Sequence, residues 1–399
     1  MNRFRSTRLA AAIQSLETRR LLCTIHDPQG LSGLPAPEDP NPLVVNEEES
    51  VASIDVLQVP NYNSRPTASK KIYLDFNGNG AIDNWNGWGW GGKNVTASHA
   101  FDNDGDSNSF SPQELADIRQ IWKGVAEKFS PWEIDVTTVR PSTINGAHVV
   151  IGGDGNWYGG GGGVASIGGW GEEGWTDPVK CNVAFVWGGQ WNPAFVTEGV
   201  AHEVGHLLGL HHQSLNPVSM NEYAPGWIMG NGEAGIGRWT STNLTGGQSS
   251  SKDDDGDIHG EGAQHDIEWI GLAGYFNGFS QRTDSVANTI GSAAQILFTT
   301  TNGVTEANVN GLMETYSDVD AFRFDHSGGN TTIEVLPAEF RGMLNPEFEI
   351  RNSQNQVLYF ADNNNAPDGV GEVVSFQNLD AGTYYITMHS TGVYGDLGQ

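Results

Sequence analysis

The sequence has 399 residues, 37% of them hydrophobic, which is enough for two domains with packed cores. Its 48 acidic residues outnumber 20 basic ones and give a formal net charge of −28 at pH 7. We exclude nucleic acids and anionic membrane surfaces as partners because such a chain repels both, and its charge fits a protein that works outside the cell. No apolar run is long enough to span a membrane, and the two cysteines, Cys23 and Cys181, are too few for a disulfide framework.

Residues 1–66 are predicted to form an export tag followed by a flexible leader or pro-segment. The stretch LETRRLL resembles a short tag near the start of some large exported bacterial proteins, so we expect secretion. The stretch GLPAPEDPNPLVVNEEES is rich in Pro, Asn and Glu, which is typical of a flexible segment. Ordered structure is expected to begin near KKIYLDFNG, where Ile72, Leu74 and Phe76 alternate with polar residues as in a strand.

The acidic stretch FDNDGDSNSFSPQEL permits two interpretations. Its first three aspartates have the alternate spacing of a calcium-binding loop, but the glycine and the glutamate that such a loop needs are out of register. Ser111 and Glu114 instead have the spacing of a helix capping box, with a proline at the first helical position. We favour the cap, and calcium (Ca²⁺) stays an open alternative here and in the acidic run SKDDDGDIHGEG.

Three further strands are predicted at EIDVTTV, AHVVIGG and CNVAFVW. Between them, residues 153–174 are so rich in glycine that we expect a long mobile loop without regular structure, able to close over a binding cleft. A strand, a helix, more strands and then a second helix follow one another along the chain. This order predicts an α+β domain, which we place at residues 67–278.

The texture of the sequence changes after residue 275. Short apolar stretches recur between Gly, Asn and Asp turns, which predicts an all-β sandwich at residues 283–399. Asp318 and Asp320 in this region are expected to cap turns rather than to bind metal. The chain stops at GVYGDLGQ, where one more strand is expected, so we predict that the sequence is a piece of a longer protein.

The stretch VTEGVAHEVGHLLGLHHQS, residues 196–214, is mostly apolar and predicts a helix, yet it contains four histidines and Glu203. His202 and His206 are four residues apart, so their rings project from one face of the helix and can bind one metal ion. Neutral imidazole is a good ligand for zinc (Zn²⁺), and Glu203 can reach a water molecule on that ion without being a ligand. Coordination would explain why a helix built for burial holds these polar groups.

Gly209 is expected to end this helix, because glycine adopts the positive φ of a sharp turn. The turn brings His212 back toward the metal as the third ligand, which a straight helix would not allow. The fourth position stays open for water, as it does at catalytic zinc and not at structural zinc. His211 cannot share the direction of its neighbour, so we predict that it lies on the surface or behind the ligands.

The span HEVGHLLGLHH resembles the zinc signature of the metzincin metallopeptidases, and APGWIMG resembles their Met-turn. This resemblance implies a five-stranded mixed sheet, an active-site helix and an irregular lower subdomain for the α+β domain. It also implies that Met229 lies beneath the metal as an apolar floor without binding it. In the β-rich region, DVDAFRFDHSGG and LDAGTYYITMHSTGVYG resemble the bacterial pre-peptidase C-terminal domain, an accessory domain without catalytic residues.

These features predict a secreted zinc endopeptidase that acts on proteins or peptides, and we take it to be a monomer. Zinc held by the three histidines would polarise the scissile carbonyl and activate water, with Glu203 as general base. The alternative is a non-catalytic matrix or polysaccharide-binding protein with a structural zinc site, against which the presence of Glu203 argues. The sequence does not reveal the cleavage preference, and Cys23 lacks the surrounding motif of a cysteine switch.

Overall fold

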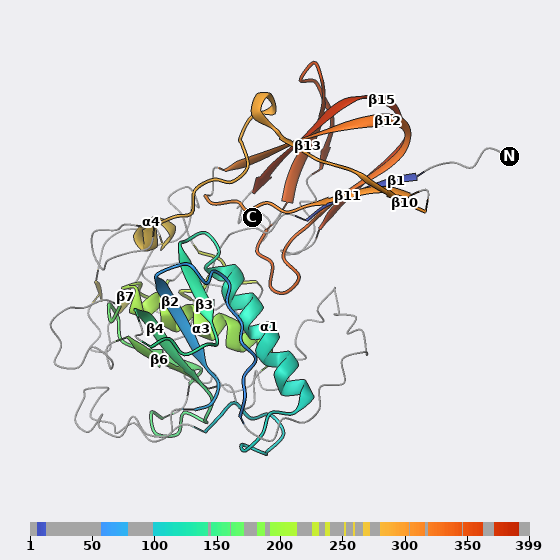
Figure 1. Cartoon of the computed structure of the whole chain (residues 1–399). Coiled ribbons are helices and arrows are strands. Elements are labelled where there is room, and N and C mark those ends of the chain that lie inside the picture. Colours follow the sequence, from blue (N-terminus) through green and yellow to red (C-terminus); the bar gives the residue numbers. More distant parts are fainter. Residues whose placement is uncertain are drawn as a thin grey trace. The chain divides into compact units, whose positions relative to one another are not determined.

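The computed structural model divides into two compact units (Figure 1). One comprises Thr18–Ala126 and Glu133–Ser280, and the other comprises Met1–Glu17, Glu127–Trp132 and Gln281–Gln399. The structure describes residues 6–12, 57–78, 99–142, 145–159, 161–170, 182–187, 192–213, 226–230, 236–239, 251–252, 258–259, 266–271, 280–302, 304–315, 318–344, 346–361 and 371–390. Cys23 and Cys181 lie outside these ranges. Among the described helices, none has both the length and the apolar character that crossing a membrane requires.

The first unit is built on a five-stranded mixed sheet with the strand order β3-β2-β4-β6-β5 (Figure 1). Its strands are β2 (Lys70–Asp75), β3 (Ile134–Thr137), β4 (Gly146–Ile151), β5 (Gly163–Ala165) and β6 (Val183–Val186). Neighbouring strands run parallel from β3 to β6, and β5 is antiparallel to β6. β3, β4 and β6 are buried along their whole length; β6 is a continuous apolar run, whereas β3 and β4 include the buried polar residues Asp135 and His148. The predicted α+β class and mixed sheet are confirmed.

β5 corrects the prediction for the glycine-rich run at residues 153–174, for which we expected no regular structure. Gly163–Ala165 pair with β6 and form an edge strand within the described part of this run. A Cβ atom on Gly163 would lie 2.7 Å from both the Phe185 carbonyl oxygen and Oε1 of Glu203. Glycine at this position therefore reflects close packing against a strand and a helix rather than mobility.

α1 (Pro112–Lys128) begins with the predicted capping box. The Ser111 backbone N–H donates to Glu114 Oε2 at 2.8 Å, and the Glu114 N–H donates to Ser111 Oγ at 3.3 Å. One face of the helix is buried and includes Ile118 and Val125, as its apolar stripe predicts. The cap explains the serine and the glutamate without a metal ion.

The remaining elements of this unit are α3 (Pro193–Leu207), α4 (Asp266–Gly271) and the paired strands β7 (Ser251–Lys252) and β8 (Ile258–His259). α3 packs against β4, β5 and β6, so it lies along the half of the sheet that ends in the edge strand. The acidic residues between β7 and β8, where calcium was left open, lie outside the part of the chain that the structure describes.

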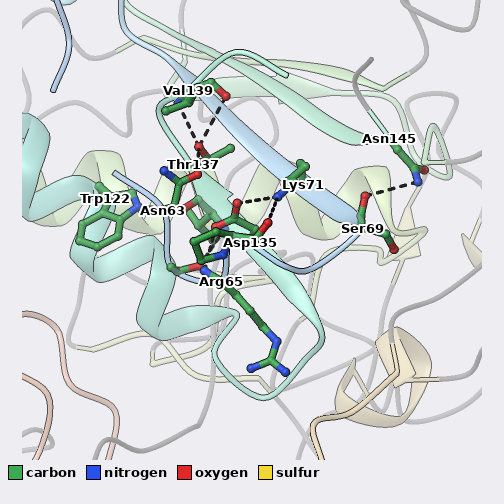
Figure 2. Close-up of polar contacts among 12 residues, drawn as sticks. Asn63, Arg65, Ser69, Lys71, Trp122, Asp135, Thr137, Val139 and Asn145 are labelled. Carbon is green, nitrogen blue, oxygen red and sulfur yellow. Dashed lines mark hydrogen bonds and ion pairs between the residues drawn. The ribbon is translucent and has the colours of Figure 1, made fainter. Parts of the chain in front are cut away.

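Polar contacts join the segment before β2 to β3 (Figure 2). The buried Asp135 carboxylate accepts hydrogen bonds from the Arg65 backbone N–H and from Lys71 Nζ, both at 2.8 Å. Trp122 of α1 donates its indole N–H to a carbonyl of β3 at 2.9 Å. Residues 57–66 thus pack on the sheet although the sequence assigns them to the leader, and the boundary at residue 66 stays a prediction.

The second unit is an all-β domain whose described strands form one eight-stranded sheet. Its strands are β1 (Ser6–Ala12), β9 (Ala294–Gln295), β10 (Thr299–Thr301), β11 (Val304–Val309), β12 (Val319–Leu336), β13 (Pro346–Asn352), β14 (Val357–Ala361) and β15 (Glu372–Ser390). A short 3₁₀ helix, Ile290–Ser292, precedes β9. The sheet is largely antiparallel, with β12 and β15 paired over most of their length, and its core includes Phe322, Phe348 and Ile386. The predicted all-β domain is confirmed.

Candidate metal centre

α3 carries the first two histidines of the signature and begins as the sequence predicts. The Asn192 side chain accepts a hydrogen bond from the backbone N–H three residues on, at 2.9 Å, and Pro193 is the first helical residue. Every residue of the helix from its third position to its end is buried. His202, Glu203 and His206 therefore lie in the interior of the unit.

α3 ends in a Schellman turn centred on Gly209, whose φ is +89°. The Leu210 N–H donates to the Gly205 carbonyl at 3.0 Å, and the Gly209 N–H donates to the His206 carbonyl at 2.8 Å. The chain reverses after this turn, and Nε2 of His212 comes to lie 3.2 Å from Nε2 of His206. Gly209 thus has the conformation that the sequence predicts for it.

The three imidazole rings converge on one point. Nε2 of His202 lies 2.7 Å from Nε2 of His206, and one ring nitrogen of each histidine lies within 4.8 Å of the other two. Nδ1 of His202 is 3.1 Å from the Ile228 carbonyl oxygen, and Nδ1 of His206 is 2.6 Å from that of Leu210. Because a carbonyl oxygen can only accept, each Nδ1 carries the donated proton, and in the neutral ring this tautomer makes Nε2 the atom that can bind a metal.

This arrangement fits a zinc ion. Burial lowers the pKa of His206 to about 3, so its ring is neutral at neutral pH. Nε2 of His202 and Nε2 of His206 lie 2.7 Å apart, and a cation at their meeting point would bind both. Two ligands about 2.0–2.1 Å from one zinc ion lie at most about 4.2 Å apart, and the Nε2 separations of 2.7 and 3.2 Å fall within this limit.

Glu203 follows His202 in α3 and is fully buried. Neither of its carboxylate oxygens accepts a hydrogen bond from the residues that the structure describes, and burial raises the pKa of the carboxyl well above its usual value. The side chain reaches β5, since a Cβ on Gly163 would lie 2.7 Å from Oε1 of Glu203. Buried polar groups normally have partners, so this carboxyl is a candidate for a group that handles a proton or a water molecule.

The turn at residues 226–230 packs against α3 between the two histidines of the helix. Met229 is fully buried, and its Sδ lies 2.5 Å from the place that a Cβ on Gly205 would occupy. The Ile228 carbonyl holds His202, and the Met229 carbonyl accepts the N–H of Gln213 just beyond the third histidine. Glycine inside the helix is therefore explained by the close approach of this methionine.

The structure brings together His202, His206 and His212 of the predicted residues, and it places the Glu203 side chain against Gly163 of β5. His211 is half-buried and is not one of the three histidines that converge. Sequence reasoning missed the carbonyls that orient the rings and the buried hydrogen bond from Gln213 Nε2 to Asp266 Oδ1 at 3.1 Å. No local pattern could reveal these partners, because residues distant in the chain supply most of them.

The fold and this site together define a metzincin-type metallopeptidase. Residues 132–213, about a fifth of the chain, match the family described as metallo-peptidase family M12B, reprolysin-like. The match runs from β3 through all three histidines and ends before Met229. The chain therefore carries a reprolysin-like metallopeptidase domain, a hydrolase that acts on peptide bonds. Among curated proteins, none matches the chain significantly.

Proposed function

We propose that the protein is a secreted, zinc-dependent endopeptidase in which Glu203 is the general base. The observation that carries this proposal is the buried Glu203 carboxyl, with no hydrogen bond from the described residues, on the helix that supplies two of three converging imidazoles. A structural zinc site has no use for such a group, because removing a carboxyl from water without a partner costs free energy. The arrangement is therefore better explained by catalysis than by stability.

Each residue of the centre has a separate task. His202, His206 and His212 would hold the metal, and the Ile228 and Leu210 carbonyls fix the two helical rings in the tautomer that binds a metal through Nε2. A bound zinc ion supplies a Lewis acid for the scissile carbonyl and lowers the pKa of water.

Glu203 moves the proton in this scheme. It accepts a proton from the attacking water on a carboxylate oxygen and then delivers it to the leaving amine nitrogen. Met229 fills the space below the helix and keeps water out of it.

The substrate is proposed to bind as an added strand along β5. This edge strand pairs with β6 on one side, and no described strand pairs with its other side. An extended peptide can hydrogen-bond to such an edge in the antiparallel sense. Because Gly163 of β5 lies against Glu203, a peptide bound there would run past the general base.

Glu203→Gln tests the proposal directly. The variant keeps the shape of the side chain but cannot take up a proton, so it should bind zinc like the wild type and lose hydrolysis of denatured casein or gelatin. The wild-type activity should disappear on chelation and return with zinc. Both the full chain and a chain beginning at residue 57 are assayed, so that inhibition by the leader is distinguished from inactivity.

Two outcomes would contradict the proposal. Wild-type turnover by Glu203→Gln would show that another group is the base. A folded, zinc-loaded protein that cleaves no substrate in either form would favour the non-catalytic binding protein.

We also propose that the enzyme acts outside the cell. Its charge of −28 and the LETRRLL stretch support this location. Fractionation of cells that express the full chain, with detection of the protein in the medium, is the test.

A further inference from the structure

Outside the metal centre, four acidic side chains gather where β12 begins in the all-β unit. Asp284 precedes β9, Glu314 follows β11, and Asp318 and Asp320 lie at the start of β12. One carboxylate oxygen each of Asp284, Asp318 and Asp320 lies within 4.8 Å of the other two. Two segments of the chain therefore supply these three carboxylates, and Glu314 lies between β11 and β12.

Backbone hydrogen bonds hold these segments together. The Ala321 N–H of β12 donates to the Ala287 carbonyl at 3.0 Å, which keeps the segment of Asp284 beside the strand. The loop before β12 is closed by the Glu314 N–H, which donates to Asp318 Oδ2 at 2.9 Å. The acids are thus carried by a fixed backbone and not by free loop tips.

Asp320 is the observation that points to a ligand. It is 0% exposed, and neither of its carboxylate oxygens completes a hydrogen bond with a residue that the structure describes. Burial, and then the charges of Asp318, Glu314 and Asp284, raise the pKa of Asp320 to about 8, against a weak opposing effect of the Leu312 backbone amide. Asp318 caps its turn as the sequence predicts, whereas that prediction fails for Asp320.

A second cluster of acidic residues differs because its carboxylates accept hydrogen bonds from the backbone. Asp102, Asp104 and Glu114 also lie close together, but Asp102 Oδ1 accepts the N–H groups of Asp104 and Gly105, and Glu114 is engaged in the capping box of α1. The backbone thus donates hydrogen bonds to these carboxylates. Asp320 differs, because neither of its oxygens completes a hydrogen bond within the described residues.

We propose that Asp284, Asp318 and Asp320, with Glu314 beside them, form a calcium-binding site in the all-β unit. Carboxylates offer only oxygen, which favours hard cations over zinc. Ligands about 2.4 Å from one calcium ion lie at most about 4.8 Å apart, and the three carboxylates meet this limit. Magnesium demands near-ideal octahedral geometry, whereas calcium accepts an irregular set of ligands such as these three carboxylates.

Calcium at this site would act on the stability of the unit. It would neutralise the buried Asp320 and Glu314 carboxylates and link the segment of Asp284 to the loop before β12. Asp284 is exposed, so water can reach the site and complete the coordination shell. The all-β unit would then have a larger free energy of unfolding in the presence of calcium than in its absence.

Calcium titration of the zinc-loaded full chain tests the proposal. By isothermal titration calorimetry we expect saturable binding with a dissociation constant of about 10⁻⁴–10⁻³ M, the range of extracellular modules. Saturation should raise the melting temperature of the unit by about 5 °C. Asp320→Asn should lose both effects, whereas Glu306→Gln, which removes the same charge from an exposed position of β11, should keep both.

A lost ligand is distinguished from a damaged fold by the calcium-free protein. Asp320→Asn removes a buried acid at nearly constant volume, so without calcium it should melt at or above the wild-type temperature. Asp284→Asn, at the surface, is the second variant and should weaken calcium binding in a folded chain. Absence of binding by the wild type, or equal binding by the wild type and both variants, would overturn the proposal.

Discussion

Replacing Gly209 by alanine perturbs the turn that brings His212 to the metal centre. Gly209 has a φ of +89°, and a left-handed conformation costs an L-residue about 1–2 kcal/mol. Alanine also restricts the unfolded chain, which offsets about 0.4–1 kcal/mol of this cost. The free energy of unfolding of the zinc-free protein, measured by urea denaturation, should therefore fall by about 1 kcal/mol.

The same substitution should weaken zinc binding. The part of the strain that the zinc-free turn relieves by withdrawing His212 must be restored when zinc binds, so the remainder of the cost of about 1–2 kcal/mol should lower zinc affinity by up to about fivefold. Competition with a chromophoric chelator measures this change. Gly209→Asn is the matched control, because asparagine tolerates positive φ at a helix end and should lose much less. Wild-type zinc affinity and stability in Gly209→Ala would refute the assigned role of the turn.

Three further predictions concern the surroundings of the centre. Gly205→Ala normally stabilises a helix by about 1 kcal/mol, but its Cβ would lie 2.5 Å from Met229 Sδ, so we expect a net loss of about 1–2 kcal/mol in urea unfolding; a gain would show that the methionine moves freely. Gly163→Ala places a methyl group 2.7 Å from Oε1 of Glu203, so the rate of hydrolysis should fall by about ten- to a hundredfold while zinc affinity stays unchanged. If the hydrolysis rate and the zinc affinity fell by equal factors, this would count against a role of β5 in positioning the base. Burial lowers the pKa of His206 to about 3. Between about pH 6.5 and 3, the His206 imidazole is therefore protonated in the unfolded chain but not in the folded zinc-free chain. As pH is lowered through this window, the free energy of unfolding should therefore decrease, by up to about 1.4 kcal/mol per pH unit from this residue. His206→Gln should make this dependence on pH less steep. An unchanged slope in the variant would mean that the His206 ring is not buried in its neutral form.

The metal centre was largely predictable because local geometry determines it. On a helix, a spacing of four residues places His202 and His206 on one face whatever the rest of the fold does. The positive φ of Gly209 is likewise a property of glycine at a helix end. These two local rules sufficed to predict that His212 returns to the other two histidines.

Features set by distant neighbours were not predictable. β5 has three residues, and only its pairing with β6 makes it a strand, so a glycine-rich sequence concealed it. The proton positions of the rings depend on the Ile228 and Leu210 carbonyls, and the carbonyl at residue 228 lies far from the ligands in sequence. Asp318 and Asp320 look alike in sequence, yet the backbone N–H groups of Glu314 and Val319 donate to Asp318, whereas Asp320 completes no hydrogen bond within the described residues.

Zinc K-edge X-ray absorption of the zinc-loaded chain tests the central claim, convergence of three imidazoles on one ion, most directly. We expect one zinc per chain with three imidazole nitrogens at about 2.0–2.1 Å. His212→Ala should remove one of these nitrogens, and His211→Ala, its adjacent control, should leave all three in place. Loss of a nitrogen in His211→Ala together with an intact shell in His212→Ala would contradict the account.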